Sequence, residues 1–177
     1  MRVDFSKTFF ELFGFAEDFA IDRAELVGRF QQLQKQLHPD KFASQPDAEK
    51  RWSMQVASYV NEAYQTLGND LRRAIYLLNV NGVSIDEETD TQMSPMFLME
   101  QMEHREALEM APSAADPFAS LDVIRRQLKA STLGQIAAFE SASSKKNWTE
   151  ARTVVRQWQF LEKLRQEVMS TEESLDS

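Results

Sequence analysis

The sequence predicts an all-α protein on three observations. Its 177 residues are rich in Leu, Gln, Glu, Ala, Met and Arg, which favour helix, but contain only five Gly and five Pro. Apolar residues recur at helical spacing through most of the chain. Residues with capping side chains stand directly before several of these periodic segments. With 42% hydrophobic and 10% aromatic residues, the chain can also build a packed core.

The first half of the chain predicts an antiparallel helical hairpin. After a short aromatic opening, residues 9–15, a helix begins at its cap Asp22 and must stop near His38, because Pro39 disfavours helical backbone in the residue before it. A second long helix follows Pro46. The loop between the two helices therefore lies at the exposed tip of the hairpin. The apolar stripes expected to face each other are Leu26, Phe30, Leu33 and Leu37 in the first helix and Trp52, Val56, Val60, Ala63 and Leu67 in the second.

The second half predicts a separate helical bundle. A third helix is expected over residues 71–78, and the polar, aperiodic residues 79–93 predict a linker between two domains, 1–78 and 94–177. Three more helices are predicted to begin at Ser94-Pro95, Asp116-Pro117 and Asn147. Their apolar stripes suit a three-helix bundle and comprise Phe97 and Leu108, then Leu121, Ile124, Leu128 and Phe139, then Ala151, Val154, Trp158 and Leu161.

Charge and composition exclude several classes of function. The net charge of -8 argues against nucleic-acid binding, which normally needs a basic face. No apolar run approaches the roughly 20 residues of a membrane-spanning helix, and acid follows the first residues at once, so we expect a soluble, cytoplasmic protein. Without cysteine the chain has no thiolate nucleophile and no Cys-ligated metal, and we expect neither cofactor nor metal.

The acidic residues are unevenly distributed along the chain. Residues 1–78 hold 11 acidic and 10 basic residues, whereas residues 79–177 hold 17 acidic and 10 basic ones. Nearly all the excess negative charge therefore lies in the second half. Two parts with different partners are plausible on this ground alone.

The tripeptide His38-Pro39-Asp40 admits several interpretations. A His beside a carboxylate could be an oriented general base, but here both residues belong to one tight turn and the chain has no nucleophile elbow or phosphate loop. A metal site has little support, since the other histidine, His104, lies in the other predicted domain. There remain a simple helix stop, in which His favours the helix C-terminus, and a turn that a partner protein recognises.

The hairpin with His-Pro-Asp at its tip resembles a J-domain, the helical module that drives ATP hydrolysis in DnaK-type chaperones. Over roughly residues 5–168 the chain is similar to the HscB family, the J-type co-chaperones of iron-sulfur cluster assembly. Two positions depart from that family, with Asp70 where we expect proline and Met110 where we expect an acid, and the N-terminal cysteine motif of eukaryotic members is absent, which favours a bacterial type. The segments that carry the resemblance are residues 10–14 (FELFG), 38–42 (HPDKF), 61–67 (NEAYQTL), 73–78 (RAIYLL), 97–100 (FLME) and 160–165 (FLEKLR).

The resemblance implies an adaptor that is not itself an enzyme. Its J-domain would engage a DnaK-like ATPase of the HscA type, and its C-terminal bundle would hold a cluster scaffold of the IscU type. The alternative is a helical interaction protein in which the tripeptide is only a helix stop. The residues expected to contact the chaperone are His38, Pro39 and Asp40, with positive charge from Arg29, Lys35 and Lys41.

A second surface is expected on the helix that starts at Pro95. At 100° per residue, Phe97 and Leu108 share one face and a set of methionines and acids lies opposite. In the last helix, Phe160 also points away from the core stripe. Methionine adapts well to partners, although these side chains could equally pack inside the protein. The expected scaffold-binding residues are Leu98, Met99, Met102, Glu103, Glu106 and Phe160.

Overall fold

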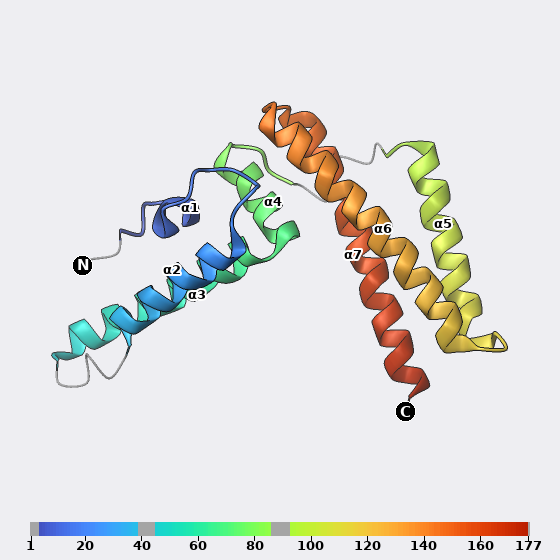
Figure 1. The fold of residues 1–177 in the computed structure, drawn as a ribbon, viewed down its shortest axis with the longest axis horizontal. Coiled ribbons are helices and arrows are strands. Elements are labelled where there is room, and N and C mark those ends of the chain that lie inside the picture. The colour runs from blue at the N-terminus through green and yellow to red at the C-terminus, as the bar shows by residue number, and fades with distance from the viewer. Residues whose placement is uncertain (1–3, 39–44, 86–92, 177) are drawn as a thin grey trace. The chain divides into compact units, whose positions relative to one another are not determined.

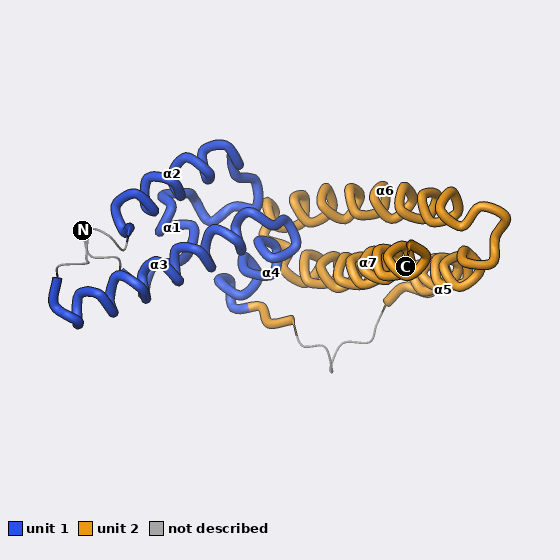
Figure 2. The backbone as a smooth tube through the Cα atoms, turned by 90° about the horizontal axis from the view of Figure 1, so that it is seen from below, with its two compact units in different colours: residues 1–82 blue, residues 83–177 orange. Residues whose placement is uncertain are grey.

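The computed structural model describes residues 4–38, 45–85 and 93–176, in which all regular elements are helices (Figure 1). The predicted all-α class is confirmed. The chain divides into two compact units, residues 1–82 and 83–177 (Figure 2). Each unit has its own set of buried apolar residues.

The centre of the first unit is the predicted hairpin of α2 (Arg23–Leu37) and α3 (Asp47–Gly68), which run side by side in Figure 1. The Asp22 carboxylate caps α2 by accepting hydrogen bonds from two backbone N-H groups. The helix ends where predicted, with His38 in extended backbone at ψ 130° before the proline. The stripe residues that are buried between these helices and their neighbours are Leu26, Leu37, Val56, Val60, Ala63 and Leu67, while Phe30, Leu33 and Trp52 are half-buried.

Two shorter helices pack around the hairpin, α1 (Phe9–Phe13) and α4 (Asp70–Val80). The first was not predicted, because five residues are too few to show periodicity. Its signals are local: Thr8 and Glu11 form a reciprocal capping box, and Gly14 ends the helix at φ 70°. The second runs two residues past the predicted end, so the start of the expected linker is helical.

A buried arginine connects α4 to the chain segment before α2. Arg73 is only 4% exposed; its Nε donates to the Phe19 carbonyl at 2.8 Å, and its terminal nitrogens donate to the Leu67 carbonyl and the Asp70 carboxylate. Asp70 also accepts from Arg23. Burial alone would raise the pKa of Asp70, but the hydrogen bonds and charges of the two arginines outweigh it and lower that pKa. The acid that replaces the expected proline therefore has a structural role.

The second unit is the predicted three-helix bundle, formed by α5 (Pro95–Met110), α6 (Pro117–Ser144) and α7 (Trp148–Leu175), with a short 3-10 turn η2 (Ala111–Ser113) after α5. Its three helices begin at the predicted caps, whose side chains each accept from a backbone N-H; these are Ser94, Asp116 and Asn147. The core includes Leu121, Ile124, Leu128, Leu161, Leu164 and Val168.

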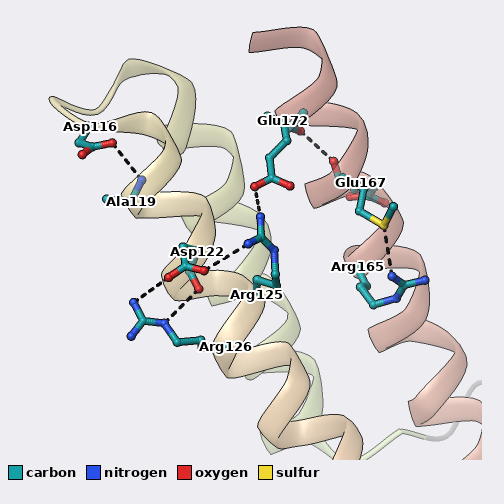
Figure 3. Close-up of polar contacts among 10 residues, drawn as sticks. Asp116, Ala119, Asp122, Arg125, Arg126, Arg165, Glu167 and Glu172 are labelled. Atoms are coloured by element: carbon teal, nitrogen blue, oxygen red, sulfur yellow. Dashed lines mark hydrogen bonds and ion pairs between the residues drawn. The ribbon is translucent and has the colours of Figure 1, made fainter. Parts of the chain in front are cut away.

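One ion pair links α6 to α7, and two more lie beside it within α6 (Figure 3). The Arg125 guanidinium contacts Glu172 across the two helices and Asp122 within its own helix at 3.2 Å. Asp122 also pairs with Arg126 at 3.0 Å. The most extensive pairing in this unit is between α6 and α7, and α5 packs against both helices.

Candidate functional site

A groove of about 570 Å³ lies on the first unit beside the end of α2. Its apolar lining comes from Leu37, Ala57 and Val60, which belong to both helices of the hairpin. The polar lining consists of Gln31, Gln34, Lys35, His38 and Asn61. An apolar floor with amide and cationic groups around it can receive a protein side chain or helix edge. The structure therefore brings His38 and Lys35 to one surface.

The rest of the predicted chaperone-binding loop is not covered by the structure. Pro39, Asp40 and Lys41 lie outside the described residues. Their contribution to a partner contact stays a prediction.

Arg29 differs from Lys35 because its guanidinium is engaged inside the unit. One terminal nitrogen donates to the Phe13 carbonyl and the other to the Glu25 carboxylate, and the group lies 4.5 Å from the centroid of the Phe15 ring. A Cβ at Gly14 would stand 2.8 Å from Arg29 Nη1, so glycine leaves room for this arginine. Arg29 thus fixes the end of α1 to α2, and a partner contact by its charge remains a prediction.

The second candidate surface is the outer face of α5. Phe97 and Leu108 are 7% and 8% exposed, whereas Met99 and Met102 are 62% and 70% exposed. Glu103 and Glu106 are exposed on the same outer side, and so is Leu98 at its edge. The helical periodicity therefore assigned the buried and open faces of α5 correctly, although partner binding by the open face stays a prediction.

Phe160 lies where α7 meets α5. Its ring is 38% exposed and makes an edge-to-face contact with Phe97, with centroids 6.3 Å apart. The ammonium group of Lys163 is 5.9 Å from the centroid of the same ring. A small pocket of about 150 Å³ adjoins it, lined by Ile85, Arg156, Gln159, Phe160 and Lys163. The structure thus places Phe160 next to α5, as a shared surface requires.

Beneath this surface lies a polar residue that the sequence pattern did not reveal. Gln101 is 7% exposed on the core side of α5, and its Oε1 has no hydrogen-bond partner among the described residues. A buried carbonyl oxygen without a donor costs free energy. Its neighbours in the buried stripe are Phe97 and Leu108, so α5 buries only three side chains along 16 residues. The sequence did hold one signal for this residue, since Gln101 falls on the same side of the helix as Phe97 and Leu108 at 100° per residue.

The acidic side chains of this surface do not form a metal site. Over the described residues, no group of three or more His, Asp or Glu side chains is arranged to hold an ion.

Known proteins agree with this architecture along almost the whole chain. A co-chaperone protein HscB homolog of Aliivibrio fischeri is 42% identical over 166 residues, which is 94% of this chain and 97% of that protein. The chain belongs to the HscB family. An HscB homolog of Vibrio cholerae is 39% identical over 167 residues, covering 94% of this chain and 98% of its own. Residues 93–169 match the family described as the HSCB C-terminal oligomerisation domain.

Solved structures of HscB proteins share the fold. Chaperone HscB from Vibrio cholerae superposes with a TM-score of 0.84 at 37% identity, over 96% of this chain and 99% of that one. The human co-chaperone protein HscB superposes with a TM-score of 0.89 at 30% identity, over 97% of this chain and 85% of that one. The first unit is accordingly the J-domain and the second the C-terminal helical bundle of an HscB-type co-chaperone. None of the helices in the described residues is long and apolar enough to cross a membrane.

Proposed function

We propose that this protein couples a DnaK-like ATPase of the HscA type to an iron-sulfur scaffold of the IscU type in the cytoplasm. The J-domain would stimulate the ATPase and the bundle would deliver the scaffold to it, without catalysis by this chain itself. The observation that carries the proposal is 42% identity to a co-chaperone HscB homolog over 94% of the chain. Two exposed surfaces, one on each unit, support this proposal because each partner would then have its own contact.

The chaperone contact is proposed at the α2–α3 groove. A co-chaperone shifts its partner toward the hydrolysing state only if it binds that state more tightly. His38 and Lys35 present polar and positive groups beside an apolar floor, and Pro39, Asp40 and Lys41 would extend the contact along the loop. Arg29 would act mainly through the internal contacts that fix α1 against α2.

The scaffold contact is proposed at the outer face of α5. Leu98, Met99 and Met102 are exposed and supply apolar area for this contact, and Phe160 would extend this area onto α7. Glu103 and Glu106 would favour a partner with positive charge around an apolar centre. Burial of the apolar side chains would then supply most of the affinity.

The test is an ATPase assay with purified HscA-type chaperone, with and without scaffold. The wild-type chain should stimulate hydrolysis, and His38→Gln should not, while its helix content and thermal midpoint stay close to wild type because His38 is exposed at a helix end. The matched control is His104→Gln, in the other unit, which should stimulate normally. Full stimulation by His38→Gln would leave the tripeptide as a helix stop, the alternative that the end of α2 at Leu37 also fits.

A further inference from the structure

Methionine is concentrated on one face of α5. Four of the eight methionines in the chain lie there, each between 62% and 73% exposed: Met96, Met99, Met102 and Met110. At 100° per residue they fall within an arc of about 120° centred on Met99, and Leu108 in the core lies about 180° from that centre. The other exposed methionines of the described residues, Met54 and Met169, lie on α3 and α7.

Thioethers so exposed are open to oxidation. A peroxide transfers one oxygen atom to the methionine sulfur, which loses two electrons and becomes a sulfoxide, while the peroxide is reduced to water or alcohol. The chain contains no cysteine, so no thiol of its own reacts in place of these sulfurs. Thiol-dependent methionine sulfoxide reductases remove the oxygen again, which makes the modification reversible.

A sulfoxide on this face would weaken docking because its oxygen is polar. It turns an apolar side chain into a polar one whose oxygen needs a hydrogen-bond donor when it is buried. The residues interleaved with the methionines are Glu103 and Glu106, and carboxylates at neutral pH only accept hydrogen bonds. A partner that buries Met99 and Met102 would therefore bury an unsatisfied oxygen at each oxidised residue.

The same change would leave the bundle folded. The side chains that α5 buries against the rest of the unit are Phe97, Gln101 and Leu108, on the opposite side of the helix, and Arg105 pairs with Glu167 of α7. Oxidation would thus alter the contact surface and spare the core.

We propose that the methionine face of α5 is an oxidation-controlled docking surface, on which conversion of Met99 and Met102 to sulfoxides releases the scaffold and enzymatic reduction restores its binding. This inference rests on the proposed function, since it requires that the scaffold docks on this face. The co-chaperone would then stop delivering scaffold under peroxide stress and resume when reducing conditions return.

The experiment treats the full chain with hydrogen peroxide, locates sulfoxides by peptide mass spectrometry, and measures binding of purified scaffold by titration calorimetry. Affinity should fall at least tenfold when Met99 and Met102 are oxidised, with far-ultraviolet circular dichroism unchanged. Incubation with both sulfoxide reductase types should restore it. The variant Met99→Leu/Met102→Leu has no thioether at these two positions, so its own affinity for the scaffold, whatever its value before treatment, should be the same after it. The matched control Met54→Leu/Met169→Leu should remain as sensitive to peroxide as wild type.

The experiment distinguishes failure of the oxidation control from failure of scaffold binding itself. If the untreated wild-type chain fails to bind scaffold, the proposed function fails and the inference falls with it. If untreated protein binds but oxidised protein binds equally well, with sulfoxides confirmed at both positions, the inference alone is overturned. Loss of helix content on oxidation, or equal peroxide sensitivity of the Met99→Leu/Met102→Leu variant, would overturn it as well.

Discussion

The apolar part of the α5–α7 surface should dominate scaffold affinity, and the triple variant Leu98→Ala/Met99→Ala/Phe160→Ala measures it. These side chains are 45%, 62% and 38% exposed. Complete burial of one such side chain is worth about 1.5–3 kcal/mol, so covering the open half of each contributes ~1 kcal/mol and the three together about 2–4 kcal/mol. The dissociation constant should therefore rise roughly 30-fold or more.

Titration calorimetry with purified scaffold measures this change directly. The variant should also keep its basal stimulation of the chaperone ATPase, since its J-domain is unaltered, but lose the additional stimulation that scaffold brings. Phe160→Ala removes an aromatic contact with Phe97 that is worth about 0.5–1.5 kcal/mol. The thermal midpoint of the variant must therefore be measured beside its affinity.

The bundle offers a control of the same residue types and similar exposure. Phe118, Leu133 and Met169 are 45%, 58% and 45% exposed on α6 and α7. Their triple replacement by Ala should leave scaffold affinity within about 0.5 kcal/mol of wild type. Equal losses in both variants would refute a specific docking face, and collapse of the first variant would show that its side chains belong to the core.

Three further outcomes are expected. Arg73→Met should lower the free energy of unfolding by about 2–6 kcal/mol in urea denaturation, since the Phe19 and Leu67 carbonyls lose this donor at about 1–3 kcal/mol each, while Asp70 keeps its hydrogen bond from Arg23; a loss under about 1 kcal/mol would show these contacts to be dispensable. Because the folded-state pKa of Asp70 is lowered, its contribution is complete above its unfolded pKa of about 4 and is lost as pH falls through the folded value. When the free energy of unfolding is measured at falling pH, it should therefore decrease less in Asp70→Asn than in the wild type. The same decrease in both proteins would show that Asp70 does not contribute to the acid sensitivity. Lys35→Glu should slow association with the ATPase more than it speeds dissociation, and less so at high salt, whereas salt-independent association would exclude this lysine from the contact.

Local chemistry explains why much of the fold was predictable. Asp22, Ser94, Asp116 and Asn147 each satisfy backbone N-H groups within three residues of themselves, so their role is readable from adjacent sequence. The hydrophobic period likewise identified the buried stripes of α3 and α6. Helix α1 was missed because its capping box and terminal glycine had no periodic segment to support them.

Contacts between distant residues could not be read in the same way. Arg29 carries the spacing of a flanking surface residue, and only the folded chain shows its guanidinium at the Phe13 carbonyl, 16 positions earlier. Asp70 had one local signal, an arginine three residues later, but its second partner Arg23 is 47 positions away. A charge pattern does not distinguish a solvated side chain from one that ties two helices together.

The attachment of α5 explains how the bundle can present an apolar face and remain folded. Side chains from α6 and α7 form most of the buried core, and the ion pair of Arg125 with Glu172 fastens their edge. Helix α5 adds three buried residues, of which Gln101 leaves an oxygen without a donor. Loss of contacts along α5 therefore costs less than loss of contacts between α6 and α7. A partner that covers the outer face would stabilise the most weakly held helix, so the energy of docking and the order of α5 are coupled.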